Sequence, residues 1–179
     1  MPIKPELNTI KEALANTYFD KCKVDDERIC EMGKTDLLRA KSIGELIDVY
    51  KYYQTLLIGR LFIPITFFRT YGGAYRQELQ DRGIYLDRQS CPLSNPKQKD
   101  IILLGNTELK LVKNDTAFTR IIACHDSKIN VLLMGCAIAE INIADKSNVK
   151  VGYINEQARL TIISHKEIIT YPQHADANT

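Results

Sequence analysis

Cys124-His125-Asp126 places a thiol, an imidazole and a carboxylate side by side, and His165 stands at a comparable place in a later segment. A cysteine nucleophile needs an imidazole within hydrogen-bond reach of its sulfur, which keeps the sulfur as a thiolate. Neighbouring residues of a strand point to opposite faces, so only His165 could serve Cys124. A small apolar cysteine beside polar turn residues explains the same pattern more simply. We predict no catalytic residue, and a thiol enzyme using Cys124 and His165 is the third of three hypotheses.

Metal and carboxylate sites are poorly supported by the spacing of the candidate residues. Cys22 and Cys30 lack the close pairing of zinc ligands, and the first half of the chain has no histidine to complete such a site. Asp25, Asp26 and Glu27 are explained as acids at the start of a helix, where they interact with its positive end. We therefore predict no metal and no cofactor.

Arginines and tyrosines are interleaved between residues 50 and 88. Arginine pairs with phosphate and aromatic rings stack on bases, so this pattern could bind nucleic acid through Arg69, Arg76 and Arg82. The net charge of the chain is only +2, which indicates no particular partner. Tyrosines lining a helical core, with arginines on its outer face, are the favoured interpretation. Nucleic-acid binding is the second hypothesis.

The composition is that of a folded protein, with 45% hydrophobic and 26% charged residues among 179. Its five cysteines are odd in number and scattered, which does not indicate a disulfide scaffold. Residues 1–10 lack the apolar core of a secretory signal, and the apolar stretch 56–68 is too short to cross a bilayer. We expect a cytoplasmic protein with no membrane partner.

Residues 1–90 are predicted to be helical. Thr9 with Glu12, and Ser42 with Glu45, have the capping-box spacing that begins a helix. A short second helix is expected to follow Asp25 and to end at Gly33, and a last helix to span residues 74–82. Prolines and polar neighbours in residues 91–99 then predict a linker.

The second half of the chain repeats at about ten residues, across residues 107–163. Six segments align on a small residue, and apolar residues recur two and four places after it with a polar residue between them, which predicts strands with one buried face. The small residues are Thr107, Thr116, Ser127, Ala137, Ser147 and Ala158. In this alignment Arg120 occupies an inward position.

This repeat favours a β-solenoid over an antiparallel sandwich or meander, because stacked corners select the same small residue in every segment. We predict an α+β fold, with the β-repeat region over residues 100–171 forming two or three coils and a polar tail over residues 172–179. The helical half is expected to cover one end of the stack. The tail is too polar to cover the other, which suggests self-association or a partner there.

Residues 146–151 (KSNVKV) and 126–131 (DSKINV) resemble the N-S-x-V-x-V repeats of β-solenoid segments in bacteriophage and prophage proteins. The resemblance covers residues 107–163 at most. It implies a protein of a virion or mobile element, located in the host cytoplasm or the assembled virion, that binds or builds and does not catalyse.

We therefore expect a non-enzymatic structural or protein-interaction module, oligomeric or bound to another protein. An alternative is a phage-encoded inhibitor of a host defence protein. The interaction surface is predicted to be the uncovered end of the stack or the row of polar residues Lys110, Thr119, Asn130, Glu140 and Lys150.

Overall fold

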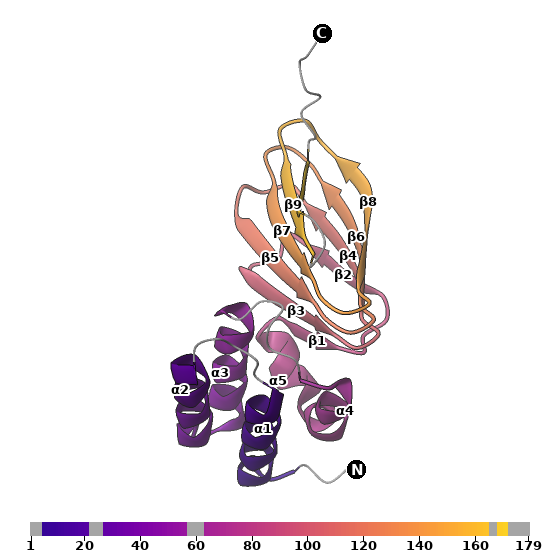
Figure 1. Cartoon of the computed structure of the whole chain (residues 1–179). Coiled ribbons are helices and arrows are strands. Elements are labelled where there is room, and N and C mark those ends of the chain that lie inside the picture. Colours follow the sequence, from indigo (N-terminus) through magenta and orange to yellow (C-terminus); the bar gives the residue numbers. More distant parts are fainter. Residues whose placement is uncertain (1–4, 22–26, 57–62, 165–167, 172–179) are drawn as a thin grey trace. The chain divides into compact units, whose positions relative to one another are not determined.

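The structure, a computed structural model, describes residues 5–21, 27–56, 63–164 and 168–171. It divides the chain into two compact units, residues 1–86 and 87–179. The first unit is helical and the second is a β-solenoid (Figure 1), which confirms the predicted α+β order. The elements of the first unit are α1 (Leu7–Lys21), α2 (Glu27–Arg39), α3 (Ile43–Leu56), α4 (Ile65–Phe67), the π-helix η1 (Phe68–Gly72), the 3-10 helix η2 (Gly73–Tyr75), α5 (Arg76–Asp81) and β1 (Ile84–Leu86).

The helix α3 begins at the predicted Ser42 cap, although the Glu45 carboxylate binds the amide one residue before the usual capping-box position. The backbone amide of Glu45 donates to Ser42 Oγ at 3.1 Å, and Glu45 Oε2 accepts from the amide of Lys41 at 2.7 Å. The apolar face of α3 is buried at Leu46, Ile47, Tyr50 and Tyr53. Capping and periodicity therefore agree, and both are visible in the sequence.

The helix α2 differs from its predicted end, because it continues past Gly33 to Arg39. Leu37 on this added part is only 1% exposed, and the hydroxyl of Tyr53 donates to Asp36 Oδ2 at 2.8 Å. Packing against α3 thus outweighs the low helix propensity of one glycine. The last helix is shorter than predicted, since the π-helix and 3-10 helix occupy residues 68–75.

The second unit is built of two sheets whose strands alternate along the chain. We call sheet A the sheet in which β3, β5, β7, β9 and β10 follow in that order, and sheet B the sheet of order β2-β4-β6-β8 (Figure 1). The strands are β2 (Cys91–Ser94), β3 (Asp100–Leu104), β4 (Glu108–Lys113), β5 (Phe118–Ala123), β6 (Lys128–Leu133), β7 (Ile138–Ile143), β8 (Asn148–Ile154), β9 (Arg159–Ile163) and β10 (Ile168–Tyr171).

One coil consists of one strand from each sheet, and equivalent residues of successive coils pair in parallel. Leu109 pairs with Ile129, and Ile129 with Val149. In sheet A, an inward column of isoleucines at 101, 121 and 141 has no solvent exposure. The predicted stacking of apolar residues is confirmed.

The solenoid has four coils, more than the two or three predicted, because β2 and β3 precede the repeat and form a coil of their own. Residues 91–94, within the predicted linker, pair with β4 from Cys91 to Ser94. Pro92 and Pro96 hide this strand from sequence analysis, since proline disfavours a central strand.

The small residue of the repeat has a structural role at one corner of the coil. Ser127 Oγ donates to the carbonyl groups of Cys124 and Gly105, at 2.9 and 3.0 Å. Thr107 Oγ1 donates to the carbonyl of Leu104 at 2.7 Å, and Ser147 Oγ to that of His125 at 3.3 Å. These buried hydroxyls satisfy corner carbonyls of the same coil or the preceding one, which explains why the position repeats.

The segment after Thr116 departs from the predicted alignment. Arg120 does not face inward, because its Nε donates to Asp100 Oδ1 at 2.7 Å on the outer face of sheet A. Thr119 occupies the inward position and is fully buried, whereas Thr116 is exposed. The corner of residues 114–117 is irregular and shifts the alignment by one residue.

Candidate protein-interaction site

The predicted polar row is only partly a row in the structure. Lys110, Asn130 and Lys150 pair in register across β4, β6 and β8 on the outer face of sheet B. Glu140 lies on β7 in sheet A, and Thr119 is buried. The structure therefore brings together three of the five residues.

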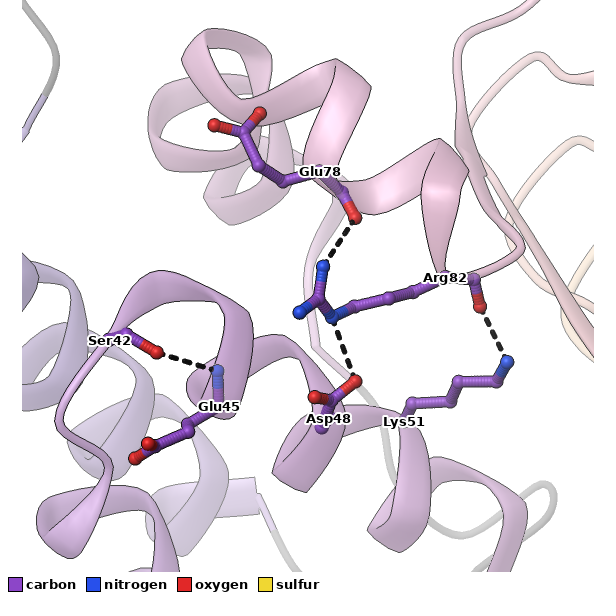
Figure 2. A network of polar contacts seen from close by, with 6 residues as sticks. All are labelled: Ser42, Glu45, Asp48, Lys51, Glu78 and Arg82. Atoms are coloured by element: carbon purple, nitrogen blue, oxygen red, sulfur yellow. Dashed lines mark hydrogen bonds and ion pairs between the residues drawn. The ribbon is translucent and has the colours of Figure 1, made fainter.

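The arginines considered for nucleic-acid binding lie in the first unit. Arg69 and Arg76 are exposed on η1 and α5. The Nε of Arg82 donates to Asp48 Oδ1 at 2.8 Å and its Nη1 to the Glu78 carbonyl at 3.4 Å (Figure 2). Lys51 Nζ donates to the carbonyl of Arg82 at 2.5 Å. Arg82 thus connects α5 to α3, and its guanidinium is engaged within the protein.

Cys124 is a buried thiol at a corner of the solenoid. Burial, with a smaller contribution from the charge of Asp145, raises the pKa of Cys124 to about 12. The Nδ1 of His125 accepts from the amide of Gly105 at 3.3 Å, which places the proton of the neutral imidazole on Nε2. Such a thiol is not a nucleophile at neutral pH, and His165 lies outside the described residues.

The described ranges offer neither a metal site nor a membrane-spanning helix. No group of three or more histidine, cysteine, aspartate or glutamate side chains is arranged there to hold a metal ion. No helix in those ranges is both long enough and apolar enough to span a bilayer.

The two sheets of the solenoid end differently, and this difference identifies the candidate site. In sheet A, β10 pairs antiparallel with β9, from Ile168 opposite Ile163 to Tyr171 opposite Leu160. In sheet B, β8 is the last strand, and among the described residues no strand pairs with its outer side. The backbone of β8 is therefore an open sheet edge.

The directions of the hydrogen bonds show which backbone groups are open. The amide of Asn148 donates to the Ser127 carbonyl at 3.0 Å, and that of Asn155 to the Leu133 carbonyl at 3.0 Å. The residues of a parallel strand point their backbone N–H and C=O groups alternately to the two sides, so the backbone groups of Lys150 also point toward β6. The backbone groups of Val149 and Val151 point away from β6, to the open edge.

The inward columns also remain incompletely covered at β8. Val131 is fully buried and Ile129 is 2% exposed, but Val149 and Val151, one coil later in the same columns, are both half-buried. In sheet A, where β10 is present, Leu160 has no exposure. The β8 edge thus combines unpaired backbone groups with apolar side chains that another strand could cover.

Two features restrict the pairing of this edge. The register between β6 and β8 shifts after Val131, so β8 bulges at Gly152. A Cβ atom at Gly152 would lie 3.0 Å from Asn130 Oδ1, which favours glycine there. Lys150 is exposed within the regularly paired part of β8, which precedes the bulge. Bulges and lysines are typical of edges that resist unspecific pairing.

The repeat pattern predicted an uncovered end of the stack but not its location on β8. The signal was present in Gly152, since a glycine within a strand pattern indicates a bulge.

Comparison with known proteins gave no match: no protein family, no curated protein and no solved structure matches the chain.

Proposed function

We propose that this protein is a non-enzymatic interaction module that binds another polypeptide by pairing the open edge of β8 with an extended segment. The observation that carries the proposal is the contrast between β9, which is covered by β10, and β8, whose outer side has no partner strand among the described residues. Strand addition at a sheet edge uses backbone hydrogen bonds for affinity and side chains for specificity.

The rigidity of the solenoid supports this role. The strands β4 and β6 each pair with a strand on both sides. Leu111 and Val131, which precede Val151 in the same inward column, are fully buried. A site held by such a stack loses little conformational freedom on binding, so more of the interaction energy becomes affinity. The opposite edge is less suitable, because Pro92 on β2 has no N–H to donate.

The proposal is tested by selecting displayed random peptides against the full chain and against Val149→Pro. The amide of residue 149 faces away from β6, so proline there removes a donor of the open edge and no hydrogen bond to β6. We expect enriched peptides that lose at least tenfold in affinity for Val149→Pro. Circular dichroism checks that the variant is folded.

The matched control is Ser94→Pro, because Ser94 faces away from β4 at the opposite edge of sheet B, as the bond from the Asn95 amide to the Val112 carbonyl implies. Peptide binding should be unchanged in this variant. An absence of enriched peptides, or peptides equally tolerant of Val149→Pro and Ser94→Pro, would contradict the proposal.

A further inference from the structure

The chemistry around Val149 and Val151 specifies what the added strand contains. In an antiparallel pair, residues that turn their backbone groups toward the partner form hydrogen-bonded pairs, and the residue between them forms the closer, non-hydrogen-bonded pair. On β8 the residue between Val149 and Val151 is Lys150. The partner residue opposite Lys150 therefore comes close to its side chain, and a charge at that position affects binding.

Lys150 is available for such a pair. It is exposed and has no ion pair with any residue that the structure describes. Lys128, on the neighbouring strand of sheet B, instead lies 3.0 Å from Glu108. On this sheet one lysine thus pairs with a carboxylate of a neighbouring strand, whereas no strand lies on the outer side of β8 among the described residues.

The inward face defines the flanking residues. Val149 and Val151 end two apolar columns, and the next side chain in each column would lie on the added strand. Apolar residues there would complete the burial of both valines, as Ile129 and Val131 are buried one coil earlier. The complementary segment thus alternates apolar, acidic and apolar residues.

A second copy of β8 does not satisfy these requirements. A two-fold arrangement that pairs Val149 with Val151 of the other copy places its axis at Lys150, and so sets Lys150 against Lys150 in a close pair. An axis at Val151 would set Val149 against Tyr153. The amide of Asn155 points toward β6, and that of Tyr153, two residues earlier, points the same way, so it cannot bond to a second copy. An axis at Val149 would set Val151 against Ser147, whose amide already donates to the Ala144 carbonyl at 3.2 Å. Charge disfavours the first arrangement, and engaged backbone amides disfavour the other two.

We infer that the β8 edge binds an extended segment of another protein in which an acidic residue, flanked by apolar residues, lies opposite Lys150. This inference rests on the proposed function and specifies its partner by chemistry. The bulge at Gly152 confines the pairing to the few residues from Asn148 to Val151, so the recognised segment is short.

The test uses three synthetic peptides, Thr-Val-Thr-Val-X-Val-Thr, in which X is glutamate, glutamine or lysine. Each is titrated into the isotopically labelled full chain, and the backbone amide signals of residues 148–151 are followed by NMR. We expect the glutamate peptide to bind about threefold more tightly than the glutamine peptide, and the lysine peptide to bind most weakly. The preference should shrink at high salt.

The decisive variant is Lys150→Glu, which should reverse the order of the three peptides. Lys110→Glu is its control, since Lys110 is also exposed in the same outward column but lies on β4, which pairs on both sides. This control should preserve the order, as judged from the same amide signals.

The outcomes separate the two proposals. Equal binding of all three peptides, abolished by Val149→Pro, would overturn the acidic preference and leave edge binding intact. No shift of the β8 signals with any peptide would overturn both. A wild-type chain that sediments as a dimer, and a Val149→Pro chain that does not, would identify a second copy as the occupant and overturn this inference. Binding that appears only after removal of residues 172–179 would overturn it in favour of the chain's own end.

Discussion

Sheets A and B are built from the same repeat, yet their last strands have different surroundings. Leu160 and Ile162 on β9 are 0% and 7% exposed, with β10 paired alongside. Val149 and Val151 on β8, one strand earlier in the chain, are half-buried at an open edge. A repeat therefore determines the interior of a solenoid but not its ends, and at β8 the end leaves apolar side chains of the repeat partly uncovered.

The chemical reactivity of two cysteines should differ more than any other property that we compare. Cys124 is buried beside sheet A, with a pKa of about 12, whereas Cys136 is exposed. The raised pKa leaves little thiolate at Cys124 at pH 8, and burial keeps iodoacetamide from its sulfur until the structure opens locally. We expect iodoacetamide to label Cys136 at least about a hundredfold faster than native Cys124, as measured by peptide mass spectrometry.

The control is labelling in denaturant, where both cysteines should react at similar rates. Comparable rates in the native protein would show that the interior beside sheet A is open to solvent. The contrast between the buried interior beside sheet A and the uncovered side chains at the β8 edge would then fail.

The same substitution at successive positions of one column should show directly how open β8 is. Val131→Ala removes buried methyl groups and leaves a cavity, which should lower the free energy of unfolding by about 2 kcal/mol. Val151→Ala, one coil later, should lower it by about 1 kcal/mol, because its side chain is only half-buried. Urea denaturation measures both variants, and equal losses would mean that β8 is not an open edge.

The strands of the repeat could be predicted from sequence because burial leaves a period of two and corners select small residues. All six aligned segments, from Thr107 to Ala158, lead into strands. The coil of β2 and β3 was missed, because Pro92 and Pro96 resemble linker residues and the first strand has only four residues. Proline is tolerated there because its missing N–H lies on the unpaired side.

The candidate site could be predicted only in part. The repeat pattern predicted an uncovered end, but it also predicted that Lys150 lies in one row with Thr119 and Glu140. Which segments share a sheet depends on the number of strands in each coil, and the alternation within one segment does not contain that number. The irregular corner after Lys113 also shifts Thr119 inward, which a repeat alignment cannot show.

Thr119 offers a smaller test, within sheet A. Its Oγ1 is buried, and no hydrogen-bond partner is found for it among the described residues. Thr119→Val keeps the shape and removes the unsatisfied hydroxyl, so it should raise the free energy of unfolding by about 1 kcal/mol. Thr161→Val, on the outer, half-buried position of the same sheet, is the control and should change stability little. A destabilised Thr119→Val would indicate that the hydroxyl has a partner.

The smallest expected difference is in how much an ion pair on the outer face of each sheet contributes to the free energy of unfolding. Asp100 pairs with Arg120 on sheet A, where the side chains are 22% and 24% exposed, and Glu108 pairs with Lys128 on sheet B, where they are 51% and 60% exposed. Water and salt screen the more exposed pair more strongly. We expect Asp100→Asn to lower the free energy of unfolding by about 0.6 kcal/mol and Glu108→Gln by about 0.2 kcal/mol. Urea denaturation at low and high salt checks both, and the gap should narrow in high salt. If Glu108→Gln cost as much as Asp100→Asn, the face of sheet B beside the open edge would be less solvated than its exposure indicates, and Lys150 would bind a carboxylate more strongly than proposed.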